Sequence, residues 1–158
     1  MELKTKINAE PGRQDLVITR EFELPVDLLF KAHEDAEIVE QVMGTHVLKF
    51  EGKKHGGYQF ETKDKQGNVV FKASGVIHEF LPNRKITRTF EMENAPFGVQ
   101  LEVYEFEPLT DDTSKLRVHV IYESGALRDQ VLKLPFAQGL NMAHNRIEEI
   151  LSKVKYPV

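Results

Sequence analysis

The chain has 158 residues, a formal net charge of −4, no cysteine and no tryptophan. This length predicts a single domain spanning 1–158, and the lack of cysteine excludes disulfides, thiolate nucleophiles and cysteine-bound metals. The balanced charge gives no basis for nucleic-acid binding, and neither a signal-peptide core nor an apolar run of about 20 residues is present, so we expect a cytoplasmic protein without membrane insertion.

The first third of the chain predicts one strand followed by two short helices. Residues 1–13 show no periodic pattern and are expected to form a loose N-terminal segment. Apolar residues alternate in 15–24, which is typical of a strand. Residues 25–35 begin with a proline suited to a first helical turn, and 35–44 end in a glycine that favours a helix stop.

Strand patterns then dominate residues 46–122, and turn residues separate about six consecutive strands. Because consecutive hairpin-linked strands pair antiparallel, this region predicts a meander. An amphipathic helix is expected over 127–155. A single helix with one apolar face needs a sheet that curves around it. We therefore predict an α+β fold in which a curved antiparallel sheet of about six to seven strands carries the C-terminal helix on its concave face.

Two residues interrupt this last helix. Pro135 predicts a kink or a break between a lead-in turn and the main helix. Gly139 follows one turn later, where a missing side chain either lets the helix approach the sheet closely or leaves space beneath it. The segment around both residues is the expected mouth of any internal pocket.

Five strings carry a resemblance to a known superfamily: VITREFELPVDLLFKAHEDAEIVEQ (17–41), GGYQFE (56–61), GVIHEFLPNRKITRTF (75–90), FEPLTDDTSKLRVHV (106–120) and RDQVLKLPFAQGLNMAHNRIEEIL (128–151). In this order they resemble the START-like (SRPBCC) superfamily, in the branch of the heat-shock chaperone ATPase activators and their small bacterial relatives. The resemblance implies a helix-grip fold with a cavity between the sheet and the C-terminal helix.

The chain departs from that resemblance at one corner. The family commonly has a tryptophan pair after the second helix, whereas this chain has Val42 and Met43. Smaller and softer side chains there would enlarge or reshape the space that the tryptophans occupy. A specific ligand therefore cannot be transferred from relatives.

Polar residues on strand faces expected to be buried are the main signal for a site. Arg88 shares a face with apolar neighbours, so it either pairs internally or contacts an anionic ligand group. Neither face of the expected strand at 99–106 is uniformly apolar. Glu105 lies on one face, and Gln100 and Glu102 lie on the other. A cavity wall and a bulged strand both explain this pattern.

Aromatic residues and two helix residues complete the predicted ligand site. Aromatic rings can form core or flat pocket walls, and tyrosines add a polar tip. A helix histidine at the margin of the apolar stripe usually bonds to a strand, and acid–base catalysis would need a partner that the sequence does not reveal. The predicted ligand-binding residues are Tyr58, Phe60, Arg88, Phe90, Tyr104, Leu140 and His144.

Metal and covalent chemistry have little support in the sequence. The six histidines, at 33, 46, 55, 78, 119 and 144, form no i,i+4 helical pair and no ligand string. His46 and His55 could face each other across a hairpin, but no third ligand is identifiable. No serine lies in a nucleophile motif. We expect no metal, no cofactor and no catalytic residue.

Three functions remain open. The first is binding of a hydrophobic or amphipathic small molecule between sheet and helix. The second is a protein-interaction module that contacts a chaperone. The third is a cofactor-free cyclase-like enzyme in which Arg88, Tyr104 and His144 orient the substrate or transfer protons. An exposed first strand could also support a homodimer.

Overall fold

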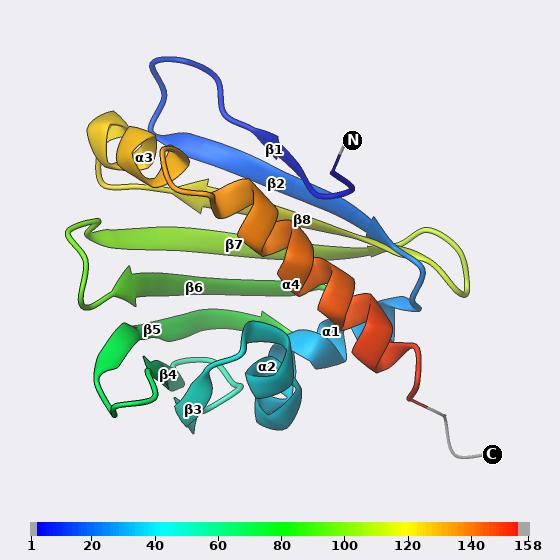
Figure 1. Cartoon of the computed structure of the whole chain (residues 1–158). Helices are drawn as coiled ribbons and strands as arrows, with labels where there is room; N and C mark the ends of the chain where they lie inside the picture. The colour runs from blue at the N-terminus through cyan, green and yellow to red at the C-terminus, as the bar shows by residue number, and fades with distance from the viewer. Residues whose placement is uncertain (1–2, 155–158) are drawn as a thin grey trace.

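The computed structural model describes residues 3–154. Strands and helices follow the predicted order (Figure 1). The elements are β1 (Lys6–Asn8), β2 (Asp15–Phe22), α1 (Val26–Glu34), α2 (Ala36–Met43), β3 (His46–Phe50), β4 (Gly57–Lys63), β5 (Val69–Leu81), β6 (Lys85–Met92), β7 (Val99–Pro108), β8 (Ser114–Ile121), α3 (Gly125–Leu132) and α4 (Phe136–Leu151).

Within residues 3–154 the strands form one open antiparallel sheet of eight strands in the order β1-β2-β8-β7-β6-β5-β4-β3. The meander from β3 to β8 confirms the predicted antiparallel connectivity. Register shifts between Val47 and Lys49, Thr62 and Lys63, and Ile77 and Glu79 interrupt the β3–β4, β4–β5 and β5–β6 ladders. Such irregularities bend strands and increase their twist, which suits a sheet that surrounds a helix.

The N-terminal segment differs from the prediction. Residues 1–13 were expected to be loose, but β1 pairs with β2, and Ile7 lies opposite Ile18. Residues 1–2 lie outside the described part. Because β2 lies between β1 and β8, it is not the exposed edge that the dimer hypothesis needed. A homodimer stays a prediction without that support.

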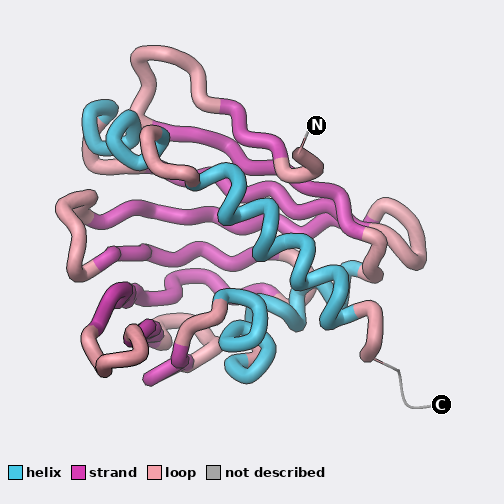
Figure 2. The backbone as a smooth tube through the Cα atoms, viewed as in Figure 1, coloured by secondary structure: helices cyan, strands magenta, loops and turns pink. Residues whose placement is uncertain are grey.

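One face of the sheet, called the inner face below, carries helix α4 (Figures 1 and 2). Alternation places Leu16, Ile18 and Phe22 of β2 there, together with Leu116, Val118 and Val120 of β8. These side chains are buried with Leu29 and Phe30 of α1. Their burial between the sheet and the helices forms the main apolar core.

The predicted C-terminal helix is broken into α3 and α4. Pro135 has no backbone N–H to donate, and the Phe136 N–H bonds to the Leu134 carbonyl instead of continuing the helical pattern. The break that Pro135 indicated is therefore confirmed. α4 ends at Leu151, and position 155 of the expected helix lies outside the described residues.

Candidate functional site

A cavity of about 560 Å³ lies between the inner face and the helices α1, α2 and α4. Its walls are mainly apolar and strongly aromatic: Phe50, Phe60, Phe71, Phe90, Phe97 and Phe136 all contribute. Ligand pockets in proteins typically span about 300–1,000 Å³ and have mostly apolar walls with a few polar groups. The space therefore has the size and character of a small-molecule site.

The segment of the last helix that contains Pro135 and Gly139 borders this cavity. Pro135 and Gly139 both line it, and a Cβ added to Gly139 would meet no atom within 4 Å. Of the two explanations for the glycine, space beneath the helix is correct and close approach to the sheet is wrong. Leu134 and Met43 also line the cavity and are 45% and 48% exposed, so apolar side chains extend from the cavity to the surface.

The corner that lacks the tryptophan pair is part of the same cavity. Val42 and Met43 both line it from the end of α2. α2 begins at Asp35, whose carboxylate accepts hydrogen bonds from the Glu37 and Ile38 N–H groups, and it stops at Gly44 in the left-handed conformation. This capping fixes where the two smaller side chains enter the cavity wall.

A polar cluster on β6 and β7 forms one wall. The Arg88 Nε donates to Glu102 Oε1 at 2.8 Å, and its Nη2 donates to the Tyr104 hydroxyl at 2.8 Å. The Gln100 amide donates to Glu102 Oε2 at 2.7 Å. The cluster follows from register, because Arg88 lies directly opposite Glu102. Of the two roles predicted for Arg88, internal pairing is the one that the structure contains.

Aromatic rings hold the guanidinium in place. The Arg88 Cζ lies 4.8 Å from the ring centroids of both Tyr58 and Tyr104. The Tyr58 hydroxyl donates to the Thr89 carbonyl, so its polar tip is satisfied within the sheet. Burial raises the pKa values of both tyrosine hydroxyls, which remain protonated near neutral pH. With Arg88 and Glu102 neutralising each other, the wall is polar but has no net charge.

Two histidines from different helices also line the cavity. His33 of α1 packs edge-on against Tyr104 and bonds through Nδ1 to the Leu29 carbonyl at 2.9 Å. Burial lowers its pKa to about 4. His144 of α4 packs edge-on against Phe22, and its pKa falls to about 3 mainly because of burial, with smaller electrostatic contributions from His33 and Arg20. Both imidazoles are neutral at pH 7.

A second network of polar side chains positions the His144 ring through its Nδ1 atom. Its Nδ1 lies 2.8 Å from the Thr5 hydroxyl. The buried Arg20 donates through Nη1 to Thr5 Oγ1 at 3.3 Å and to Asn141 Oδ1 at 3.2 Å, and its Nη2 lies 2.5 Å from Glu148 Oε1. This network connects Thr5, which precedes β1, with β2 and α4, and it fixes the His144 ring relative to the sheet.

All of the predicted ligand residues except Tyr58 line the cavity, and Tyr58 supports it from beneath Arg88. Whether any of them contacts a ligand stays a prediction. The predicted set omitted His33, Gln100 and Glu102, which also line the cavity. The mixed polarity of residues 99–106 in the sequence pointed to Gln100 and Glu102, which lie on β7.

The predicted pairing of His46 and His55 across a hairpin is wrong, whereas His33 and His144 reach the internal cavity. His46 and His55 do not face each other: His46 lies opposite Glu61 in the β3–β4 pair, and the His55 ring lies 6.3 Å from that of His78. Within residues 3–154 no group of three His, Asp or Glu side chains could hold a metal ion.

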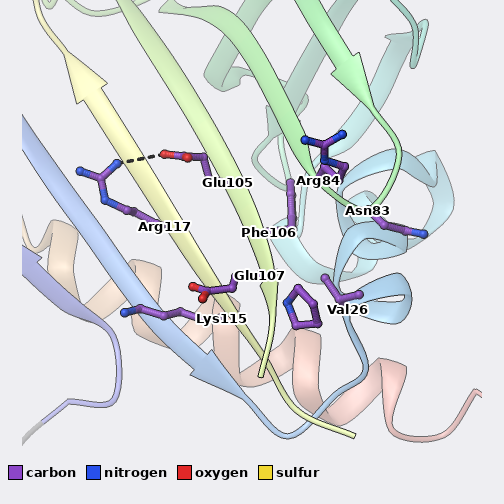
Figure 3. Close-up of a pocket in the computed structure, with 9 residues that line it drawn as sticks. Val26, Asn83, Arg84, Glu105, Phe106, Glu107, Lys115 and Arg117 are labelled. Atoms are coloured by element: carbon purple, nitrogen blue, oxygen red, sulfur yellow. Dashed lines mark hydrogen bonds and ion pairs between the residues drawn. The ribbon is translucent and has the colours of Figure 1, made fainter. Parts of the chain in front are cut away.

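A second hollow, of about 500 Å³, opens on the other side of the sheet (Figure 3). Charged side chains of both signs surround it, and Arg117 donates to Glu105 at 3.0 Å across its border. Arg84 and Val26 complete the side near α1. None of the predicted ligand residues lines this hollow. Its exposed and charged walls make it a poorer small-molecule site than the inner cavity.

The fold and the inner cavity together define a protein of the START (SRPBCC) class. The chain matches the family described as "Activator of Hsp90 ATPase homolog 1-like protein" over residues 23–152, and it belongs to that family. The predicted resemblance is thus confirmed. No helix within residues 3–154 has the length and apolar character needed to cross a membrane.

Solved bacterial structures share the fold. A protein from Rhodobacter sphaeroides superposes with a TM-score of 0.82 at 18% identity, covering 94% of this chain and 100% of that one. Protein Ms6760 from Mycobacterium smegmatis gives 0.82 at 20% identity, with 96% and 99% covered. A protein from Arthrobacter aurescens gives 0.81 at 16% identity, with 94% and 92% covered. No curated protein matches the chain by sequence.

Proposed function

We propose that this protein binds a neutral, largely apolar small molecule in the cavity between the sheet and α4. The observation that carries the proposal is the cavity itself, which combines about 560 Å³ of space with aromatic walls. At about 30 Å³ per molecule, water alone would fill it with roughly 19 molecules, most of them against apolar surface. Transfer of a ligand's apolar surface into this space is favourable.

The electrostatics of the cavity select against charge. Glu102 already neutralises the Arg88 guanidinium, so an anionic ligand would bring a second carboxylate or similar charge with no cation of its own. An unpaired buried carboxylate is costly. His33 and His144 are neutral near pH 7 and bring no charge. A neutral amphipathic molecule uses the aromatic walls without breaking the Arg88 pair.

Native mass spectrometry of the protein purified from its own source tests the proposal. We expect an added mass of a small organic molecule that is released on unfolding. In Ala143→Trp, a bulky ring enters the cavity from α4, and the added mass should be lost. Met142→Trp is the matched control, because Met142 is exposed on the same helix and does not line the cavity. Equal masses retained by both variants would contradict the proposal.

The chaperone-contact hypothesis remains a second prediction, and the name of the family is its only support. It requires an outer surface rather than the cavity, so Ala143→Trp should leave a chaperone contact unchanged. Pull-down with a purified chaperone ATPase tests it separately. The cyclase-like hypothesis would require turnover of a bound molecule, which mass analysis of the released ligand would detect.

A further inference from the structure

Two histidines on the helices that border the cavity each have a defined hydrogen-bonding role: one is a donor and the other an acceptor. We infer that the ligand carries an uncharged hydroxyl-type group that accepts a hydrogen bond from His144 Nε2–H and donates one to His33 Nε2. The inference rests on the proposed function, since it specifies what the cavity recognises. It follows from which ring nitrogen of each histidine is already engaged.

His33 is an acceptor toward the cavity. Its Nδ1 lies 2.9 Å from the Leu29 carbonyl oxygen, and a carbonyl can only accept, so Nδ1 carries the proton. Because the ring is neutral near pH 7, Nε2 then holds a lone pair. α1 therefore presents a hydrogen-bond acceptor to the ligand.

His144 is a donor toward the cavity. The Thr5 hydroxyl oxygen accepts from Arg20 Nη1, and within residues 3–154 its own hydrogen has no acceptor except His144 Nδ1. The hydroxyl thus donates to Nδ1, and the proton of the neutral ring resides on Nε2. Thr5 acts as a positioning residue that sets the tautomer of His144.

The two Nε2 atoms are free to bind a ligand. Neither has a hydrogen-bond partner among residues 3–154, yet no buried side-chain nitrogen or oxygen in that range is unsatisfied. Both atoms must therefore border open space, and the space that both residues line is the cavity. One donor and one acceptor from two helices match a hydroxyl group, which supplies both complements.

Long-range ¹H–¹⁵N NMR of the full chain with ¹⁵N-histidine tests the tautomers directly. We expect the Nδ1–H form for His33 and the Nε2–H form for His144. Thr5→Val should convert His144 to a mixture of tautomers, whereas Thr5→Ser, which keeps the hydroxyl, should preserve the Nε2–H form. An Nδ1–H form of His144 in the wild type would overturn the inference.

Fluorescence titration with four pyrenes tests the recognition. Each hydrogen bond is worth about fivefold in affinity, so 1-hydroxypyrene should bind about fivefold tighter than 1-methoxypyrene, which only accepts, and that ether about fivefold tighter than pyrene. Pyrene-1-carboxylate should bind weakest. His33→Phe should remove the difference between the hydroxyl and methoxy probes, and His144→Phe should remove the difference between the methoxy probe and pyrene. The exposed His46→Phe should change neither.

The outcomes separate this inference from the proposed function. Equal binding of all four pyrenes would overturn the inference and leave a cavity-binding protein. Tightest binding of the carboxylate would also overturn it, because the site would then select an anion rather than an uncharged hydroxyl group. Binding of none of the four probes would contradict both statements.

Discussion

The two ends of α4 meet the sheet in different ways. Near its C-terminus, Leu151 is buried, and Glu148 receives a hydrogen bond from Arg20, whose side chain is fully buried. Near its N-terminus, Gly139 faces open space, and Arg88 on the opposite wall keeps 17% of its side chain exposed. The same helix is thus packed at one end and stands over a cavity at the other.

Arg20, which is buried, and Arg88, which is partly exposed, show what this difference means. Arg20 donates to Glu21, Thr5, Asn141 and Glu148, so every nitrogen of its guanidinium is engaged. Arg88 uses Nε and Nη2, and within residues 3–154 its Nη1 has no partner. Complete satisfaction is typical of a structural role, whereas incomplete satisfaction beside a cavity leaves a group available to a ligand. We therefore expect the packed end to control stability and the open end to control binding.

The largest expected effect is at the packed end. Arg20→Met leaves the Glu148 carboxylate and the Thr5 and Asn141 side chains without their shared donor. Breaking a buried pair in this way costs about 3–5 kcal/mol of unfolding free energy. Urea denaturation checks the value. A loss below about 1 kcal/mol would show that this network does not hold α4.

The contribution of each cavity histidine to the pH dependence of stability is the next largest effect. Folding lowers the pKa of His33 to about 4 and of His144 to about 3, in both cases mainly through burial. Below about pH 6.5 the unfolded chain binds protons at these sites and the folded chain does not, so stability falls as the pH decreases from about 6.5 toward 4.

Each histidine should contribute roughly 2–3 kcal/mol to this loss. Urea denaturation at pH 7 and pH 4 measures it, and His33→Gln and His144→Gln should each flatten the difference by that amount. His46→Gln, at an exposed position, should leave it unchanged. Identical pH profiles for the wild type and both cavity variants would contradict the burial of these rings.

Arg88→Met tests the open end and should cost less than Arg20→Met. Glu102 keeps its bond to Gln100 and can be hydrated from the cavity, so we expect a loss of about 1–3 kcal/mol in urea denaturation. The neighbouring Tyr104 keeps a hydroxyl contact with Glu102. Equal losses for the two arginine variants would remove the distinction between the two ends of α4.

Gly139→Ala is the smallest expected effect and has the opposite sign. A Cβ there meets nothing within 4 Å, so the helix should gain about 1 kcal/mol from the better propensity of alanine. Gly75→Ala is the contrasting control, because its Cβ would lie 2.0 Å from the Thr89 carbonyl oxygen and should destabilise the sheet. Thermal denaturation compares them, and destabilisation by Gly139→Ala would indicate a filled space beneath the helix.

The sequence predicted those parts of the fold that depend on local patterns. Alternation and turn residues indicated the meander, and Pro135 indicated the break before α4. β1 was missed because its three residues are too short for a period, and Thr5 beside it is held by contacts with His144 and Arg20 from distant segments.

The site was predicted less completely for a similar reason. Arg88 lies opposite Glu102 only through the register of the β6–β7 hairpin, and local composition does not fix that register. The burial of His33 depends on Tyr104 and Phe106 packing against it from β7. Sequence patterns could place these residues on faces but could not show that the faces enclose a cavity.

Titration with the neutral dye Nile red tests the central claim most directly. The wild type and Met142→Trp should bind the dye saturably at one site, and Ala143→Trp should weaken that binding at least tenfold because its ring occupies the cavity. In a chain with no native tryptophan, each variant's single indole also reports whether the dye lies near it. Equal binding by both variants would contradict a ligand site beneath α4.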